Sequence, residues 1–312
     1  MKVAKHVQKP NFFIIGAPKC GTTALSEYLR EHPDVHFSYP KEPNFFCTDF
    51  SEQHREFKDY TFYLNQCFYN SKGKTAVGEG SVYYLYSSEA VPNILKFQPK
   101  AKFIVMLRNP VDIAHSLHAT HLRSGINENI EDFETAWNLQ DERKEGKNLP
   151  PHCTDYKLVM YRDICKTGEQ LKRLFQWVDK SKVKIILFED FVNDTLKVYK
   201  EVLDFLNVKY DGREEFPNIN YNFRSKSKVL AKIIHKLSYK FAWILLVKKK
   251  IGIPEGFSLL GPVKRLNSEK SSRKELDTAF REKLVVEFRD DVSLLEKLIN
   301  RDLSHWKYGG LK

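Results

Sequence analysis

The sequence lacks the features that mark several other classes of protein. No stretch approaches the roughly 20 consecutive apolar residues that a membrane-spanning helix needs. Residues 1–10 are polar and the first apolar run is short, so we expect no signal peptide. We find no internal repeat and no low-complexity linker. These absences predict a soluble, cytoplasmic protein, and a catalytic fragment trimmed from a membrane-anchored enzyme is the alternative.

Cysteine is scarce, with five residues in a chain of 312. They are Cys20, Cys47, Cys67, Cys153 and Cys165, and no two of them have the C-x-x-C spacing of a metal site. An odd number also argues against a complete disulfide framework. The cysteines therefore predict a protein of a reducing compartment.

Positive charge and aromatic residues are abundant. Lys and Arg number 51 against 40 Asp and Glu, which gives a formal net charge of +11. This charge suggests an acidic ligand such as a nucleotide, a sulfated or uronic glycan, a nucleic acid or an anionic lipid surface. The alternative is that the charge only keeps the protein soluble. Apolar residues make up 42%, with 22 Phe and 15 Tyr, so a folded core is expected rather than disorder.

Short apolar segments alternate with helical patterns along the chain. The predicted strands are Phe12–Ile15, Thr75–Glu79, Phe103–Leu107 and Val183–Phe188. The predicted helices are Thr22–Glu31, Val111–Arg123, Asp132–Arg143, Thr167–Lys180, Leu196–Leu206 and a long final helix from about Glu275 to Asn300. This alternation predicts an α/β fold with a central parallel sheet flanked by helices. Sites in such sheets lie beyond the carboxyl ends of the strands.

We expect one domain over residues 1–312, in which residues 211–270 form an irregular, basic helical cover. The apolar segment Phe241–Val247 within it is flanked by lysines. Such a segment could touch a membrane surface, or it could be a buried helix whose lysines reach solvent.

The first predicted strand runs into the loop Gly16-Ala-Pro-Lys-Cys-Gly21-Thr22-Thr23 at a helix start. Backbone N–H groups and the positive helix end converge at such a loop, which suits an anion. Its glycines have the spacing of the G-x-x-x-x-G-K-[ST] nucleotide loop, but Thr22 replaces the lysine, which stands at position 19. A Mg²⁺-triphosphate ligand therefore loses an expected contact.

A second motif follows the strand Phe103–Leu107, which ends in Arg108. Asn109 suits the N-cap of the next helix and Pro110 its first position, so Ser116 should lie about two turns into that helix. Arg108 and Ser116 could both reach one phosphate. The alternative is an ordinary strand-to-helix turn with a solvated arginine.

The loop "GAPKCGTTAL" and the turn "LRNPVDIAHS" together resemble the sulfotransferases that use 3′-phosphoadenosine 5′-phosphosulfate, particularly their bacterial and heparan-sulfate-type branch. The segments "YPKEPNFF", "VGEGSVYYLYSSEAVPNI", "TGEQLKRLFQWVDKSKVKIILFEDFVND" and "FRDDVSLLEKLINRDLSHW" resemble later segments of that branch in the same order. The resemblance covers almost the whole chain and implies the P-loop-like sulfotransferase fold.

The resemblance also implies a set of site residues. The 5′-phosphosulfate would be held by Lys19, Cys20, Gly21, Thr22 and Thr23. The 3′-phosphate would be held by Arg108 and Ser116. By the same resemblance Lys19 assists departure of the sulfuryl group, Glu42 accepts the proton of the acceptor, adenosine 3′,5′-bisphosphate is the product, and no metal takes part. A lysine aimed at the oxygen on which charge develops stabilises the transition state more than the ground state.

Several assignments on the acceptor side stay open. Glu42 could be only an ion-pair partner of Lys41, and His115, His118 and His121 are rival bases because histidine titrates near neutrality. Asn44 stands where many relatives have histidine, and Gly80 stands where heparan-type relatives have lysine. Tyr84 and Ser81 could line the acceptor cleft or simply pack. The late basic residues, which could contact the 3′-phosphate, the acceptor or only solvent, are Arg224, Lys226, Lys228, Lys264 and Arg265.

The resemblance implies transfer to a hydroxyl, or to an amine, of a sugar or glycolipid, with no nucleic-acid partner. Small-molecule and polyketide or lipid acceptors are alternatives within the same reaction class. A P-loop small-molecule kinase and a non-catalytic module that binds polyanions are alternatives of other classes.

Overall fold

The computed structural model describes residues 3–219, 223–225, 268–270 and 275–307. These residues group into two compact units. The first contains Met1–Leu117, Met160–Ile219 and Leu276–Lys312, and the second contains His118–Val159 and Asn220–Glu275. Most of the predicted cover at 211–270, including Phe241–Val247, lies outside the described residues. The assignment of residues 1–312 to one domain stays a prediction.

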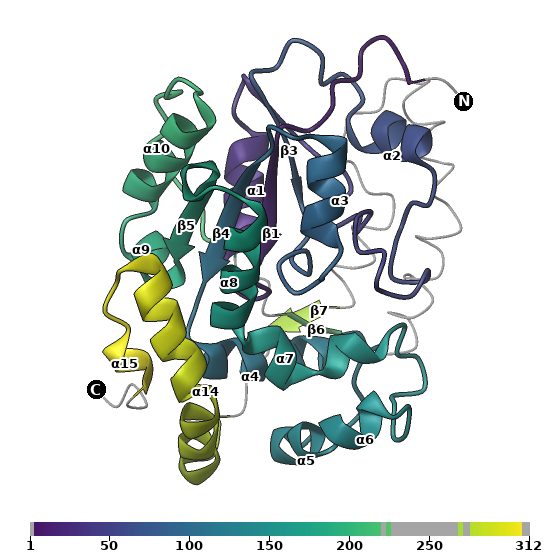
Figure 1. Ribbon diagram of the computed structural model, residues 1–312, viewed down its shortest axis with the longest axis vertical. Helices are drawn as coiled ribbons and strands as arrows, with labels where there is room; N and C mark the ends of the chain where they lie inside the picture. The colour runs from purple at the N-terminus through teal and green to yellow at the C-terminus, as the bar shows by residue number, and fades with distance from the viewer. Residues whose placement is uncertain (1–2, 220–222, 226–267, 271–274, 308–312) are drawn as a thin grey trace. The chain divides into compact units, whose positions relative to one another are not determined.

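A five-stranded parallel sheet forms the centre of the first unit (Figure 1). Its strands, in spatial order, are β2 (Val35–Phe37), β3 (Ala76–Gly80), β1 (Phe12–Gly16), β4 (Lys102–Leu107) and β5 (Val183–Leu187). All four pairings are parallel, and β1 and β3 are buried along their whole length. The predicted α/β fold with a central parallel sheet is confirmed. Sequence analysis missed β2, because three residues are too few for a periodic pattern.

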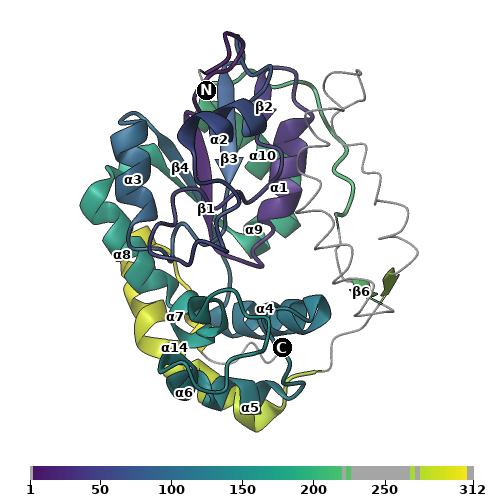
Figure 2. The same ribbon diagram turned by 90° about the vertical axis from the view of Figure 1, so that its right-hand side faces the viewer.

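Helices cover both faces of this sheet. Figure 2 shows α1 (Thr22–Arg30) on one face, with α3 (Ala90–Phe97) and α8 (Thr167–Trp177) on the other. The remaining helices of the first unit are α2 (Tyr60–Cys67), α7 (Tyr161–Cys165), η2 (Lys180–Lys182), α9 (Phe188–Asn193), α10 (Thr195–Leu206), α14 (Thr278–Ile299) and α15 (Ser304–Lys307). The predicted helix Thr167–Lys180 ends three residues early, because Val178 has extended backbone.

The second unit holds short elements. Among its described residues these are α5 (Phe133–Asn138), α6 (Gln140–Lys144), η1 (Tyr156–Val159) and the antiparallel pair β6 (Phe223–Ser225) and β7 (Ser268–Lys270). The helix α4 (Pro110–Ser124) begins in the first unit and ends in the second.

The prediction of one helix over Asp132–Arg143 is wrong, because the chain forms α5 and α6 with a break at Leu139. The second helix carries Arg143 into a fully buried ion pair, in which its two terminal nitrogens donate to Glu128 at 2.7 and 2.8 Å. This contact lies 15 residues away in the chain, so helical periodicity does not reveal it.

The helix α14 packs against α8, one of the helices that cover the sheet. The buried Asp291 carboxylate of α14 accepts the N–H groups of Gly168 at 2.9 Å and Glu169 at 2.8 Å, so it caps the first turn of α8. A Cβ atom at Gly168 would lie 2.4 Å from the backbone oxygen of Asp291. The close approach of the two helices therefore requires a glycine.

We expect Gly168→Ala to lower the free energy of unfolding by about 3 kcal/mol, since α8 and α14 must separate to admit the methyl group. Urea denaturation measures the change. Gln176→Ala, on an exposed position of the same helix, is the control and should change stability by less than about 0.5 kcal/mol. Equal stability of the two variants would contradict the helix contact described above.

Candidate functional site

The loop after β1 has the geometry of an anion-binding loop. Lys19 (φ 64°) and Gly21 (φ 84°) both have left-handed backbone, and Gly21 is the N-cap of α1. Among the described residues, no side chain makes a capping hydrogen bond at this helix start. The positive end of α1, which is nine residues long, therefore suits an anionic partner beside a lysine.

Arg108 lies against this loop. Its Nη1 donates to the backbone oxygen of Lys19 at 3.3 Å, and its guanidinium lies 4.6 Å from the centre of the Phe188 ring. A Cβ atom at Gly21 would lie 3.3 Å from the same ring. Phe188 thus supports both the loop and the arginine. Because β1 and β4 are adjacent and parallel, their carboxyl ends bring Lys19 and Arg108 together.

A second arginine joins this cluster from α14. Arg281 donates to Asp112 at 3.1 Å, and the other oxygen of Asp112 lies 3.8 Å from Nη2 of Arg108. Both arginine side chains are partly exposed, at 28% and 22%. Sequence analysis missed Arg281, which comes 173 positions after Arg108 in a helix with many charged residues. Nothing in its local pattern points to the site.

The other predicted donor residues lie on the same elements. Thr22 is buried and Thr23 half-buried in the first turn of α1, and Ser116 is half-buried on α4 one turn beyond Asp112. The Cys20 side chain is fully buried, and burial raises the pKa of its thiol to about 12. The Cys20 thiol, which also donates to the backbone oxygen of Pro18 at 3.4 Å, therefore stays protonated and packed in the core.

The backbone of Glu42 is hydrogen-bonded to the end of β3, which neighbours β1 in the sheet. Its N–H donates to the carbonyl of Gly80 at 3.0 Å, and its own backbone is left-handed, with φ 65°. The carboxylate is 35% exposed and forms an ion pair with Lys41. The ion pair between Lys41 and Glu42, which the sequence offered as the alternative to a catalytic role for Glu42, is present. The Glu42 carboxylate nevertheless stays partly exposed. The loop after β1 and Arg108 thus follow the ends of two adjacent strands, β1 and β4, and Glu42 is hydrogen-bonded to the end of β3, the next strand of the sheet.

A buried carboxylate, that of Glu79, lies close to the segment that carries Glu42. Glu79, at the end of β3, is fully buried and accepts hydrogen bonds from Tyr63 (2.6 Å), Ser81 (2.6 Å) and Tyr84 (3.1 Å). Burial raises the pKa of Glu79 to about 7, against the lowering effect of these hydroxyls and of Lys41. Ser81 and Tyr84 are themselves fully buried. Of the two alternatives left open for them, lining the acceptor cleft or packing, their burial favours packing.

Glu79 should give stability a specific pH dependence. The unfolded chain releases this proton near pH 4.5 and the folded chain near pH 7, so the folded state binds more protons between these values. The stability of the wild type relative to Glu79→Gln should therefore fall by about 3 kcal/mol from pH 4.5 to pH 8. Urea denaturation of both proteins at several pH values measures the difference, and a difference that does not change with pH would contradict the assignment.

Glu56 is a second carboxyl group near Glu42 that sequence analysis missed. Its N–H donates to the carbonyl of Pro43 at 3.1 Å, and burial raises the pKa of its carboxyl to about 7. The residue belongs to an irregular segment without periodicity, so only the folded structure shows that it is shielded from water. Its titration is shared by wild type and Glu79→Gln and cancels in the comparison above.

The rival histidine bases lie on α4. His118 is buried in the second unit, where its Nε2 lies 2.9 Å from the oxygen of Ile130 and its ring 4.9 Å from that of Phe133. Burial lowers the pKa of His118. His121 is also buried, and His115 is half-buried. The contacts of His118 are those of a packed side chain.

Some predictions fall outside the described residues. Lys226, Lys228, Lys264 and Arg265 are among them, and only the backbone of Arg224 is described. Within the described ranges, no helix is long and apolar enough to span a membrane. The same ranges contain no group of three or more His, Cys, Asp or Glu side chains arranged to hold a metal ion.

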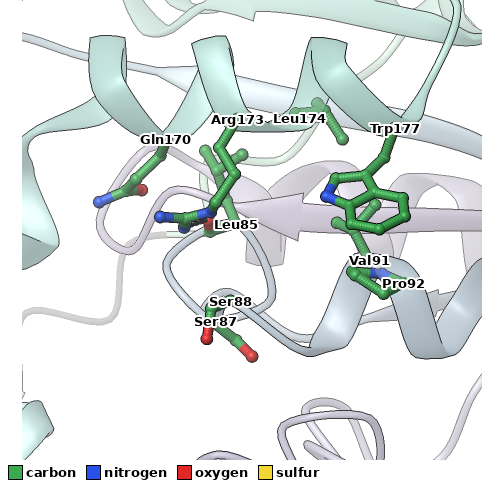
Figure 3. Close-up of a pocket in the computed structure, with 9 residues that line it drawn as sticks. All are labelled: Leu85, Ser87, Ser88, Val91, Pro92, Gln170, Arg173, Leu174 and Trp177. Atoms are coloured by element: carbon green, nitrogen blue, oxygen red, sulfur yellow. Dashed lines mark hydrogen bonds between the residues drawn. The ribbon is translucent and has the colours of Figure 1, made fainter.

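A small hollow in the first unit is not a substrate site. Figure 3 shows it between α8 and the segment after β3, with the Trp177 ring beside Val91 and Pro92. Its volume is about 10 Å³, which is room for about one water molecule. Arg173 donates there to the backbone oxygens of Leu85 and Tyr86, both at 2.8 Å. This arginine therefore ties the segment after β3 to α8.

The chain is similar in sequence to a known protein family and to several characterised proteins. The family described as "Sulfotransferase domain" matches residues 9–292. Carbohydrate sulfotransferase 15 of Homo sapiens is 27% identical over an alignment of 253 positions, which covers 64% of this chain and 44% of that protein. The bifunctional heparan sulfate N-deacetylase/N-sulfotransferase 4 of Mus musculus is 27% identical over 71% of this chain and 24% of that protein. The chain thus spans less than half the length of these curated relatives.

A solved structure is similar over the whole fold. The crystal structure of a sulfotransferase from Alicyclobacillus acidocaldarius superposes with a TM-score of 0.72 at 28% identity. The match covers 96% of this chain and 100% of that chain.

Proposed function

This chain belongs to the Sulfotransferase domain family, and from that premise we propose that it moves a sulfuryl group from 3′-phosphoadenosine 5′-phosphosulfate to a hydroxyl of a carbohydrate or glycolipid. One observation carries the proposal. The start of α1 with Lys19 and the guanidinium of Arg108 follow two adjacent parallel strands, β1 and β4, and the segment that carries the Glu42 carboxylate is hydrogen-bonded to the end of the neighbouring strand β3. This arrangement offers cations to a polyanionic donor and a base to an acceptor.

The chain's own groups divide between the two ends of such a donor. When bound, the donor supplies an activated sulfuryl group and about four negative charges. We assign its 5′-phosphosulfate to Lys19, to the backbone of residues 20–21, and to Thr22 and Thr23 at the start of α1. We assign the 3′-phosphate to Arg108 and Ser116, and the Lys19 ammonium to the charge that develops during transfer.

Glu42 is assigned as the proton acceptor. Its carboxylate is partly exposed beside Lys41, on a backbone attached to Gly80. A carboxylate in this place can take the proton of an acceptor hydroxyl as the new bond to sulfur forms. The mechanism that we propose assigns every step to groups of the protein and includes no metal ion.

Nucleotide binding separates this proposal from a kinase. Adenosine 3′,5′-bisphosphate at about 100 times its dissociation constant should stabilise the protein by about 3 kcal/mol in the presence of EDTA, whereas Mg-ATP should not. Thermal unfolding followed by fluorescence measures both. Stabilisation by Mg-ATP alone would favour a small-molecule kinase and overturn the proposal.

Transfer of radiolabelled sulfate to a panel of acceptors tests the reaction itself. We expect label on sugars or glycolipids. Label only on small-molecule, polyketide or lipid alcohols, or on amines, would correct the acceptor class and keep the reaction. A module that only binds polyanions would transfer no label and would lose its ligand steeply as salt rises. The relatives' carbohydrate and heparan sulfate names support sugars first. A cytoplasmic location is part of the same proposal.

A further inference from the structure

The segment that carries Glu42 is held by three backbone N–H groups. The first is the N–H of Glu42, which donates to Gly80. The N–H of Asn44 donates to the hydroxyl of Ser81 at 3.1 Å, and the N–H of Phe46 donates to the hydroxyl of Tyr84 at 3.3 Å. Since Glu42 and Asn44 both have left-handed backbone, with φ of 65° and 50°, the segment needs such contacts to keep its conformation.

Glu79 sets the direction of two of these contacts. A hydroxyl has one proton, and when Glu79 is ionised the hydroxyls of Ser81 and Tyr84 both donate theirs to its carboxylate. Their oxygen lone pairs are then left to accept the backbone N–H groups of Asn44 and Phe46. One buried carboxylate thus orients two hydroxyls, and each hydroxyl holds one amide of residues 42–46.

The cost of this arrangement indicates that it is more than packing. A fully buried carboxylate destabilises a protein unless its oxygens accept hydrogen bonds. Apolar side chains of similar size at such a position often give equal or greater stability. The charged group that acts on Glu79 from the Glu42 segment is Lys41, which also pairs with Glu42. Hydrogen bonds and charge therefore both connect Glu79 with the residue assigned as the base.

We propose that Glu79 is a positioning residue for Glu42. Acting through the hydroxyls of Ser81 and Tyr84, it fixes the backbone of residues 42–46 and so the place of the Glu42 carboxylate. The inference rests on the proposed function, because it gives Glu42 a role in transfer. A shift of about 1 Å in a reacting group can lower a rate by up to about a hundredfold, so the position of this segment matters for turnover.

The test compares three hydroxyl deletions around the same carboxylate. Ser81→Ala removes one tether and should lower kcat about tenfold. Tyr84→Phe removes the longer tether and should lower kcat about threefold. Tyr63→Phe is the matched control: it also takes one hydroxyl from Glu79, but that hydroxyl holds no amide of residues 42–46, and the ring that stacks 4.2 Å from Phe45 is kept. Its kcat should stay within about twofold of the wild type.

Each kcat is expressed per site that binds adenosine 3′,5′-bisphosphate, so loss of folded protein does not imitate loss of positioning. The dissociation constant of this nucleotide should stay within about twofold in every variant, because its loop follows β1. Should Ser81→Ala fail to fold, Glu79→Gln, which keeps the size of the side chain, tests the same link and should lower kcat by at least tenfold.

The outcomes are distinct. Equal losses of kcat in Ser81→Ala and Tyr63→Phe, or unchanged kcat in both Ser81→Ala and Glu79→Gln, would overturn the positioning role while leaving the proposed function intact. A wild type that neither binds the bisphosphate nor transfers sulfate would instead overturn the proposed function, and the inference with it.

Discussion

Lys19→Ala should lower kcat/KM for the donor about a thousandfold, the largest effect that we expect from any single substitution. The residue lies in the loop at the start of α1, where its backbone oxygen also accepts a hydrogen bond from Arg108. Removing one preorganised charged donor from a transition state typically costs a factor of about 100 to 1,000. Weaker binding of the polyanionic donor adds to that loss.

Sulfate transfer and bisphosphate affinity are measured on the same preparations. Lys72→Ala is the matched control, because it removes the same charge from an exposed loop far along the chain from the anion loop. It should retain wild-type rates. If Lys19→Ala also retained turnover, neither the role of Lys19 nor the mechanism built on it could stand.

Glu42→Gln should lower kcat by a factor of about 100 to 1,000 and leave the affinity for adenosine 3′,5′-bisphosphate unchanged. The amide has nearly the size of the carboxylate, but it cannot take the proton of the acceptor. Because the nucleotide contacts are assigned to other strand ends, loss of kcat without loss of binding is the pattern that identifies a base.

Glu52→Gln provides the control for this substitution. Glu52 also forms an ion pair with a lysine, Lys58, but its side chain is 68% exposed and it is not attached to a strand of the sheet. It should keep wild-type kinetics. Full activity of Glu42→Gln would move the role of base to another group, and Glu56 would then be the next carboxyl to test.

The sequence predicted the parallel sheet and the loop that follows β1 because both depend on short-range signals. Four of the five strands are short segments that are β-branched or apolar in large part, and the loop between β1 and α1 has its glycines at a fixed spacing. The position of Arg108 directly after β4 was predictable for the same reason. Once the sheet is parallel, adjacent strands must bring these residues to one edge.

Other parts of the site depend on contacts between distant segments. Arg281 reaches Asp112 from a helix near the end of the chain, and Phe188 supports Gly21 across a similar separation. The shielding of Glu56 from water is likewise a property of the folded chain, and so is the set of three hydroxyls, from Tyr63, Ser81 and Tyr84, that surrounds Glu79. The buried ion pair of Arg143 also depends on a residue outside the segment 132–143.

The cap on α8 also bears on how the chain is made. The carboxylate that begins this helix belongs to Asp291, 123 positions after Gly168. During synthesis on the ribosome, the first turn of α8 therefore emerges long before its cap exists. The first unit reaches its complete set of contacts only once the C-terminal helix has been translated, so a chain stopped early would leave that helix start exposed to chaperones and proteases.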